Sequence, residues 1–179
     1  MIRGNKIGLR ARHEADVPVL HTVLYNDVAT RSRQDPRPWK PIPPESAHSP
    51  YAVVGPSDQT VPFSVVELAS EDLVGAAGLW GIDMHNRSAH LGLSLLPDFR
   101  GRGLSSDIVR ALCEYGFAVL GLQRLQVETL ADNAAMIAAA KRAGFTIEGT
   151  LRSAAWVYGT FVDKVELGLL AHEWTPYHD

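Results

Sequence analysis

A glycine-containing loop that follows an apolar strand and opens an amphipathic helix is the feature that most constrains this chain. It reads LLPDFRGRGLSSDIVRAL over Leu95–Leu112. Gly101 and Gly103 let the backbone come close to a ligand, and the first N–H groups of the helix have no partner inside it. Arg100 and Arg102 add charge to the positive end of the helix dipole. The segment predicts an anion site, with phosphate as the usual anion; the alternative is a turn that merely caps a surface helix.

Composition limits the partners of that site. The chain has 179 residues, of which 46% are hydrophobic and 21% charged, as in a globular protein. We therefore expect a single domain over residues 1–179. The formal net charge of −3 indicates no broad basic surface, so no nucleic-acid partner is expected. Any anion site must therefore be confined to a local group of residues such as the loop with Arg100 and Arg102. The one cysteine, Cys113, lies in the helical pattern, and we interpret it as a small core residue rather than a nucleophile.

The N-terminal residues MIRGNKIGLRARHEAD lack the apolar run of a signal peptide. No later segment is long and apolar enough to span a bilayer. These patterns predict a cytoplasmic protein with no membrane partner.

Hydrophobic periodicity predicts alternating strands and helices. Residues 7–11 alternate as a strand, and residues 17–24 repeat at helical spacing behind Asp16 as a candidate cap. Eight of the eleven prolines fall in residues 35–62, which excludes a regular strand or long helix there and favours a partly ordered flap beside a site. The later elements are a hairpin (62–70 and 71–83), strands at 88–97, 124–130, 145–152 and 161–171, and helices after Gly103 and over 133–144. In the first of these helices Ile108, Leu112, Tyr115, Val119 and Leu122 share one stripe. This order gives a mixed α/β sheet with helices on both faces.

The loop and a second motif together resemble a known family. RGRGLS followed by a helix, and then ADNAAMIAAAKRAGF, are similar to the acetyl-CoA-dependent N-acetyltransferase superfamily called GNAT. Arg100 and Gly103 match its loop pattern Arg/Gln-x-x-Gly-x-Gly/Ala, with Ser105 in place of the last small residue. Asn133, followed by Gly-Phe at 144–145, matches the second pattern. The resemblance covers roughly residues 6–174 and implies a mostly antiparallel central sheet with one splayed parallel strand pair.

The C-terminal part resembles the branch that includes ribosomal-protein N-terminal acetyltransferases. That branch has a Glu-Gly-x-x-Arg/Lys run and a later Gly-x-x-x-Asp, and this chain has Glu148, Gly149, Arg152, Gly159 and Asp163 in the same order.

Two other glycine-loop families are excluded by single residues. A dinucleotide-binding loop, Gly-x-Gly-x-x-Gly/Ala, needs Gly or Ala where this chain has Ser106, and an ATPase-type phosphate loop needs Lys where it has Leu104.

The resemblance implies acetyl-CoA as cofactor and a set of residues that bind it. The pyrophosphate would be held by backbone N–H groups of Arg100, Gly101, Arg102, Gly103, Leu104 and Ser105, with the Ser106 hydroxyl, and the pantetheine arm by backbone groups of Leu93, Ser94, Leu95 and Leu96. One of these strand N–H groups would also polarise the thioester carbonyl. Asn133 is implied as a pantetheine or strand-spacing contact; as a residue type it is equally an N-cap, and both roles are compatible.

The positions that donate or accept protons in the family carry no titratable side chain in this sequence. Ala140 replaces a tyrosine that protonates the thiolate, Met136 replaces a serine, and Ala155 replaces a glutamate base. A thiol with a pKa near ~8.5 can leave as thiolate without an acid, and an α-amino group with a pKa near ~7.7–8.0 arrives partly neutral. The remaining candidate catalytic residues are His90 and Glu128, on strands beside the cleft; each is alternatively an ordinary half-exposed strand residue.

Further polar and aromatic residues admit two interpretations each. Asp83 and His85 are typical of a turn, and no metal site is expected. Trp39, Trp80 and Trp156 either wall an acceptor pocket or belong to the core.

The sequence thus predicts an acetyl-CoA-dependent N-acetyltransferase whose acceptor is a small-molecule amine or a protein N-terminus. The alternatives are a non-catalytic acyl-CoA-binding module, favoured by the missing acid and base, and an antibiotic or amino-acid acetyltransferase. The resemblance alone suggests a homodimer.

Overall fold

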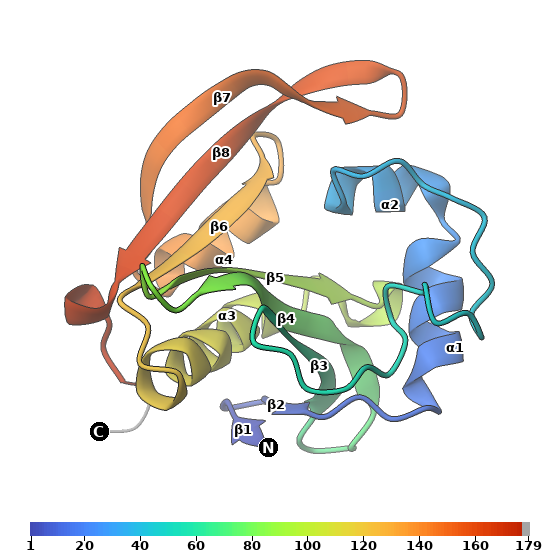
Figure 1. Ribbon diagram of the computed structural model, residues 1–179, viewed down its shortest axis with the longest axis horizontal. Helices are drawn as coiled ribbons and strands as arrows, with labels where there is room; N and C mark the ends of the chain where they lie inside the picture. Colours follow the sequence, from blue (N-terminus) through green and yellow to red (C-terminus); the bar gives the residue numbers. More distant parts are fainter. Residues whose placement is uncertain (177–179) are drawn as a thin grey trace.

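A computed structural model describes residues 1–176 of the chain, so the last three residues of the predicted domain lie outside the described residues. An eight-stranded sheet in the order β1-β2-β3-β4-β5-β6-β8-β7 forms its centre (Figure 1). Every neighbouring pair is antiparallel except β5 and β6, which run parallel. The predicted fold class, a mostly antiparallel α/β sheet with one parallel pair, is confirmed. The strands are β1 (Ile2–Arg3), β2 (Ile7–Arg10), β3 (Thr60–Glu67), β4 (Leu73–Asp83), β5 (Ser88–Leu95), β6 (Arg124–Leu130), β7 (Thr146–Val157) and β8 (Thr160–Leu170).

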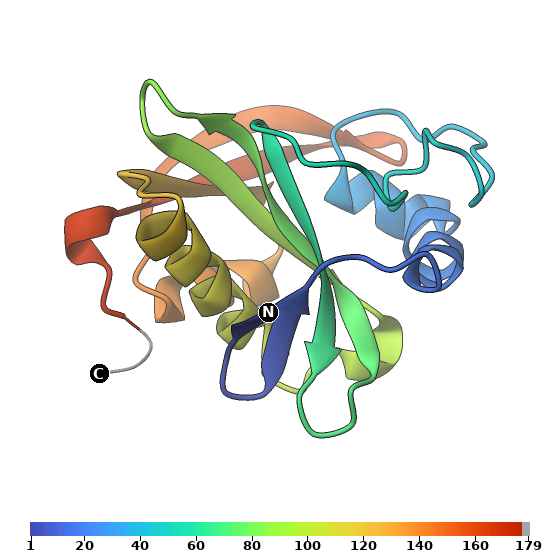
Figure 2. The same cartoon turned by 60° about the horizontal axis from the view of Figure 1, so that its bottom comes forward.

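Helices connect the strands on both sides of this sheet. The α-helices are α1 (Asp16–Leu20), α2 (Val28–Gln34), α3 (Leu104–Glu114) and α4 (Ala134–Arg142). Helices α1 and α3 continue as the π-helical turns His21–Tyr25 and Tyr115–Val119, and two 3₁₀ turns lie at Pro97–Phe99 and Ala171–Glu173. Figure 2 shows α1 and α3 on opposite sides of the central strands.

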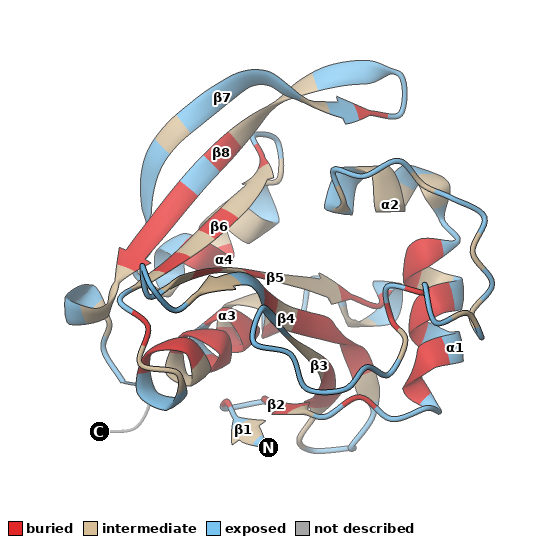
Figure 3. Ribbon diagram, viewed as in Figure 1, coloured by how far each residue is buried: buried red, intermediate tan, exposed pale blue. Residues whose placement is uncertain are grey.

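Two apolar clusters account for the two helical layers. Neighbouring side chains on a strand point to opposite faces, and on β4 Ala77 belongs to the larger cluster under α3 and α4 while Ala76 belongs to a smaller cluster under α1. In Figure 3 both α1 and α3 carry buried residues, in agreement with an apolar cluster on each side of the sheet. Cys113 is 1% exposed in the larger cluster, as predicted for a core residue, and burial raises the pKa of its thiol.

The parallel pair is short. Only Ser88–His90 of β5 pairs with Arg124–Gln126 of β6, although β5 continues to Leu95 and β6 to Leu130. Beyond this ladder the two strands separate, and their carboxyl ends stand apart. Helix α3 forms the crossover between them, as parallel strands require.

The structure corrects four local expectations. Asp16 is the first residue of α1 rather than its cap, and its carboxylate accepts from the His13 N–H, 2.9 Å away, and binds Arg10. Strand β3 begins at Thr60, two residues before the predicted strand and inside the proline-rich segment that was expected to contain no regular strand. The π-helical turn Tyr115–Val119 ends the helix, so the buried Leu122 lies beyond it. Val119 is 57% exposed and does not share the buried face of the helix.

The proline-rich segment is irregular but is held against α1. The Trp39 indole donates to the Tyr25 carbonyl (3.0 Å), and the Tyr25 hydroxyl donates to the Lys40 carbonyl (2.8 Å). His21 is fully buried, with Nδ1 2.7 Å from the Ser49 hydroxyl and Nε2 2.7 Å from the Ile42 carbonyl. Because these bonds replace regular secondary structure, the segment is ordered without being a helix or strand.

One carboxylate docks helix α3 onto the N-terminal hairpin. Asp107, in the first turn of α3, is buried and accepts hydrogen bonds from the N–H groups of Asn5 (2.9 Å), Lys6 (2.7 Å) and Ile7 (3.1 Å). These donors form the turn between β1 and β2, so this carboxylate fixes where α3 begins relative to the sheet.

We predict that Asp107→Ala lowers the free energy of unfolding by about 3 kcal/mol, because the buried N–H of Ile7 and the partly buried N–H groups of Asn5 and Lys6 lose a charged acceptor. Urea unfolding followed by circular dichroism measures the change. Asp58→Ala, at an exposed loop residue, is the matched control and should leave the midpoint unchanged. Equal midpoints for the two variants would show that the carboxylate does not dock the helix.

Candidate functional site

The gap between β5 and β6 leaves backbone groups of β5 without a neighbouring strand. The Leu96 N–H donates to the Val74 carbonyl of β4 (2.9 Å), and hydrogen-bonding direction alternates along an antiparallel ladder. Leu93 and Leu95 therefore direct their N–H groups toward the gap, while Ser94 pairs with β4. Of the four residues predicted to meet the pantetheine arm, Leu93 and Leu95 thus have N–H groups that face the gap, whereas the N–H of Ser94 does not.

Leu96 does not fit that prediction. Its N–H is used by Val74 and its carbonyl accepts from the Phe99 N–H at 3.0 Å. The expectation of free backbone groups at Leu96 is therefore wrong, because the chain turns into the Pro97–Phe99 3₁₀ turn one residue after the strand ends.

The glycine loop lies at the open end of this gap. Gly101 (φ +72°) and Gly103 (φ +76°) are both left-handed, and a Cβ at either would have no atom within 4 Å. Gly103 is the N-cap residue of α3 and offers no side chain to cap it. The first-turn N–H groups of Leu104–Ser106 have no partner within the helix. The loop thus combines open space with oriented donors, as an anion site needs.

The two arginines of the loop are less free than the sequence indicated. The Arg100 N–H donates to Pro97 (3.2 Å), and its Nε donates to the Leu95 carbonyl (3.1 Å). Arg102 pairs with Glu67 of β3 at 2.7 Å and lies over the Phe99 ring. The positive charge that Arg102 was expected to add to the loop is balanced by Glu67. The positive character of the loop rests mainly on backbone donors from Gly101 onward and on the Arg100 guanidinium.

Asn133 caps helix α4 at the other arm of the gap. Its side-chain oxygen accepts from the Met136 N–H (3.3 Å), and its amide nitrogen donates to the Thr129 hydroxyl (3.0 Å). The capping interpretation is therefore confirmed, while the pantetheine contact stays a prediction. Helices α3 and α4 thus both direct their N-termini to the open end of the splay.

The positions expected to handle protons contribute no titratable group. Ala140 is fully buried in the core, and Met136 packs partly buried against it. Ala155 lies on β7. Acid or base groups must come from another face of the gap.

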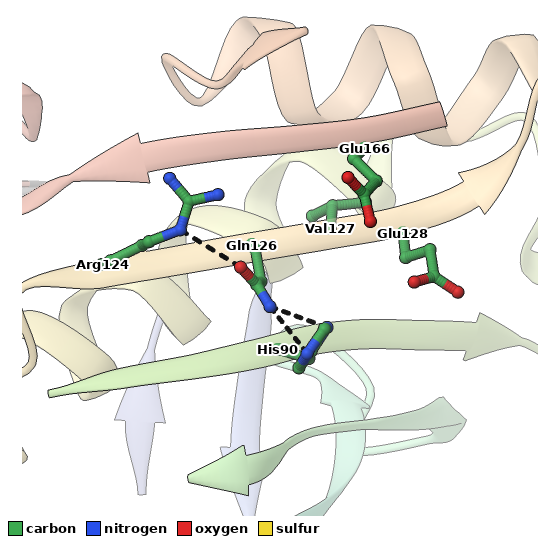
Figure 4. A pocket seen from close by; sticks show the side chains of 6 residues that line it. All are labelled: His90, Arg124, Gln126, Val127, Glu128 and Glu166. Atoms are coloured by element: carbon green, nitrogen blue, oxygen red, sulfur yellow. Dashed lines mark hydrogen bonds between the residues drawn. The ribbon is translucent and has the colours of Figure 1, made fainter. Parts of the chain in front are cut away.

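The face of the sheet opposite α3 is polar around the end of the parallel ladder. Figure 4 shows a small cavity of about 40 Å³ lined by His90, Arg124, Gln126, Val127, Glu128 and Glu166. This volume holds only a few water molecules. Both predicted catalytic residues line it, His90 from β5 and Glu128 from β6.

His90 is held by an aromatic stack and an amide. Its ring lies parallel to Trp80 at 5.8 Å between centroids, and Nε2 is 2.7 Å from the Gln126 side-chain nitrogen. Gly92 makes room for the stack, since a Cβ there would lie 2.8 Å from the indole. Burial lowers the pKa of His90 below its usual value, against the opposite influence of Glu128 and Glu166. The imidazole is therefore neutral at pH 7.

Glu128 is already paired. Its carboxylate binds the Lys164 ammonium of β8, so it enters any reaction as one half of an ion pair. Glu166 lies directly opposite Glu128 across the β6–β8 ladder. Two carboxylates facing each other repel, and the cation of Lys164 offsets part of that repulsion.

Helix α2, which the sequence did not predict, bridges the two arms of the gap. Arg33 pairs with Asp132 after β6 (2.5 Å), and the Ser94 hydroxyl of β5 donates to Gln34 (3.3 Å). None of its residues is buried. The available signal was Asp27, which caps the helix by accepting from the Thr30 N–H; the segment has no apolar period to mark it.

The three tryptophans considered as walls of an acceptor pocket lie in different surroundings. Trp80 contacts a cavity residue, Trp39 donates a hydrogen bond to Tyr25, and Trp156 is 62% exposed on β7. Asp83 accepts from the N–H groups of His85 and Asn86, both at 2.9 Å, as a turn residue does. Within residues 1–176 no three His, Cys, Asp or Glu side chains gather as a metal site would require.

In the same described range, no helix has the length and apolar character needed to cross a membrane.

A splayed parallel pair with a glycine loop and two helix N-termini at its open end defines a class of acyltransferase folds. The model of the GNAT acetyltransferase domain matches residues 6–146, and the chain belongs to this family. The predicted family is thereby confirmed.

Relatives of known name fall in more than one branch. The chain is 33% identical over 102 residues to a putative ribosomal N-acetyltransferase of Bacillus subtilis (strain 168), covering 57% of this chain and 56% of that protein. It is 26% identical over 121 residues to the spermidine N(1)-acetyltransferase of Escherichia coli (strain K12), covering 68% and 64%. The matched part is less than two thirds of either relative, and the two relatives do not assign the chain to the ribosomal branch.

Among solved structures, the fold resembles spermidine N-acetyltransferase from Vibrio cholerae in complex with CoA and spermine. The TM-score is 0.77 at 19% identity, over 98% of this chain and 100% of that chain. At this identity the likeness concerns the fold.

We predict that Asn133→Ala lowers the free energy of unfolding by about 1 kcal/mol through loss of the cap. Asn133→Asp keeps the capping oxygen and should unfold like the wild type in urea. An Asp variant as unstable as the Ala variant would show that the Thr129 contact, not the cap, stabilises this turn.

Proposed function

We propose that this protein is an acetyl-CoA-dependent N-acetyltransferase that acts on a small primary amine. The observation that carries the proposal is the splay of β5 from β6, with oriented backbone donors along one arm and at the glycine loop. Family membership supports the same conclusion.

The residues present fit the cofactor. The open space beside Gly101 and Gly103 and the N–H groups of Gly101–Ser106 suit a pyrophosphate. The N–H groups of Leu93 and Leu95 suit the amide carbonyls of a pantetheine arm, and one of them would stabilise the oxyanion that forms on the thioester carbonyl. Bound acetyl-CoA would supply the acetyl group as a thioester, and coenzyme A would depart as its thiolate.

The acceptor would approach from the polar face. Glu166 attracts an ammonium group there, while Glu128 is held by Lys164, and His90 is the group that takes the proton of the ammonium. A free amine nitrogen then attacks the acetyl carbon. Because a thiol ionises near ~8.5, thiolate departs without a dedicated acid, which agrees with the alanine at position 140.

The acceptor class rests on charge and on relatives. Carboxylates on the acceptor face favour a cationic amine, and the family includes spermidine acetyltransferases. A protein N-terminus is the second acceptor class, supported by the putative ribosomal relative. A non-catalytic acyl-CoA binder is the alternative from another class, favoured by the missing groups at Met136, Ala140 and Ala155.

We expect micromolar acetyl-CoA binding by titration calorimetry, lost in Gly103→Trp because the indole fills the phosphate space. Gly159→Trp is the matched control, since Gly159 has a similar positive φ (+98°) and open surroundings in the β7–β8 turn. Absence of wild-type binding would refute the cofactor assignment and both the enzyme and binder functions with it.

We further expect thiol release from acetyl-CoA with primary amines, measured with a disulfide dye over a panel of polyamines, monoamines and peptides. His90→Gln should lower kcat/KM by roughly 10²-fold, as loss of a general base does. His85→Gln, at an exposed turn histidine, controls for the substitution itself. Binding of acetyl-CoA without turnover on any amine would favour the non-catalytic binder.

A further inference from the structure

The charges around the cavity of Figure 4 form two ion pairs and leave one further carboxylate. Arg124 pairs with Glu148, and Lys164 pairs with Glu128. We propose that Lys164 sets the charge specificity of the acceptor site. With Lys164 on Glu128, the site takes an acceptor with a single positive charge, a small monoamine rather than a diamine or polyamine. This inference rests on the proposed function and narrows its substrate class.

The ion pair of Lys164 and Glu128 lies beside the place where the acetyl group would react. The parallel ladder ends with the pair of His90 and Gln126. Glu128 lies two residues beyond this end on β6, and Leu93, three residues beyond it on β5, directs its N–H into the gap. Because residues two apart on a strand share a face, Glu128 lies on the acceptor face with Gln126. A charge at Glu128 therefore acts on an amine close to its point of attack.

Lys164 reaches this carboxylate from the neighbouring strand. In the β6–β8 ladder Lys164 stands opposite Leu130, while Glu166 stands opposite Glu128. The Lys164 ammonium therefore crosses diagonally to Glu128, a distance that a long side chain can span. The two side chains of the pair are 18% and 31% exposed, so salt and water screen their attraction less than on an open surface. Lys164 thus neutralises Glu128 as a partner for the ammonium group of an acceptor.

Glu166 is the carboxylate that remains for an acceptor. It lines the cavity from β8, it is exposed, and it takes part in none of the ion pairs formed within residues 1–176. The cavity and its direct partners thus carry three carboxylates and two cations, which leaves a net charge of −1 while His90 is neutral. One ammonium group compensates this charge.

Helix α2, which bridges the two arms of the gap, opposes a second positive charge. Arg31 and Arg37 both pair with Asp35, and Arg33 pairs with Asp132. Three arginines at this helix therefore share two carboxylates. A diamine whose chain extends from the gap toward α2 would bring its second ammonium group to this excess of positive charge, whereas a monoamine would not.

The test compares amines of equal length and different charge: butylamine against putrescine, and pentylamine against cadaverine. Thiol release from acetyl-CoA is followed at constant ionic strength, because a diamine salt otherwise screens charges more strongly. We expect wild-type kcat/KM to be higher for the monoamine of each pair, mainly through a lower KM. This comparison tests the inference without any variant.

The variants change the charge at position 164. Lys164→Met frees Glu128 and should shift the ratio of the two kcat/KM values about tenfold toward the diamine, an effect between that of a charge pair in water and one near a protein surface. Lys164→Arg keeps the cation and should keep the wild-type ratio. Lys141→Met removes the same charge at an exposed lysine in the last turn of α4 and should also keep it.

The His90 ring reports the same charge without turnover. Lys164 and Arg124 oppose protonation of His90, whereas Glu128 and Glu166 favour it. Lys164→Met should therefore raise the pKa of His90, and Lys164→Arg should leave it unchanged. The measurement is an NMR titration of the histidine rings, assigned with His90→Gln, in the absence of cofactor and acceptor.

The outcomes separate this inference from the proposed function. A wild type that prefers the diamines, or an active Lys164→Met variant with the wild-type ratio, would overturn the charge specificity while the acetyltransferase function stands. An unchanged pKa of His90 in folded Lys164→Met would show that the lysine charge does not reach the cavity and would also overturn it. Acetyl-CoA binding without turnover on any amine would refute the proposed function and this inference together.

Discussion

Three residue pairs of parallel ladder, between Ser88–His90 and Arg124–Gln126, join the two halves of the sheet by backbone hydrogen bonds. On either side the antiparallel ladders are longer, with seven register pairs between β3 and β4 and seven between β6 and β8. The halves are therefore rigid while their junction is short. Where the ladder stops, β5 turns unpaired donors into a gap, and both α3 and α4 begin at its open end. The placement of every candidate binding group follows from the short length of the parallel ladder between β5 and β6.

Side chains alternate between the two faces of β5, so its core residues and its polar residues lie on opposite sides of the sheet. Leu91 of β5 points into the core under α3, while His90 points to the opposite, polar face. Donors for an anion gather at the glycine loop, and charged side chains gather around His90. The fold thus keeps the proposed phosphate-binding end and the proposed proton-accepting face apart, connected by the backbone of β5. An enzyme built this way relies on positioning and oriented backbone donors more than on side-chain acids.

Local patterns were sufficient to predict much of this arrangement. The strand alternation, the glycine loop that opens α3, the cap at Asn133 and the core position of Cys113 depend on neighbours in sequence. Helix α2 was missed because its stability comes from Asp27 and from pairing of Arg33 with a distant turn, not from an apolar stripe. Arg102 was misjudged for the same reason, since Glu67 lies 35 positions away along the chain. Long-range partners of charged side chains leave no periodic signal.

Polar side chains reinforce the junction where the backbone ladder is shortest. Glu148 on β7 holds Arg124 on β6, Arg124 holds Gln126, and Gln126 reaches across to His90 on β5. This chain passes over Gly168, where a side chain would block it. Each partially buried link is stronger than it would be in water, and each orients the next. The glutamate of the Glu-Gly run thereby contacts the proposed base through two intermediate side chains, so the same contacts join β7, β6 and β5 across the short junction.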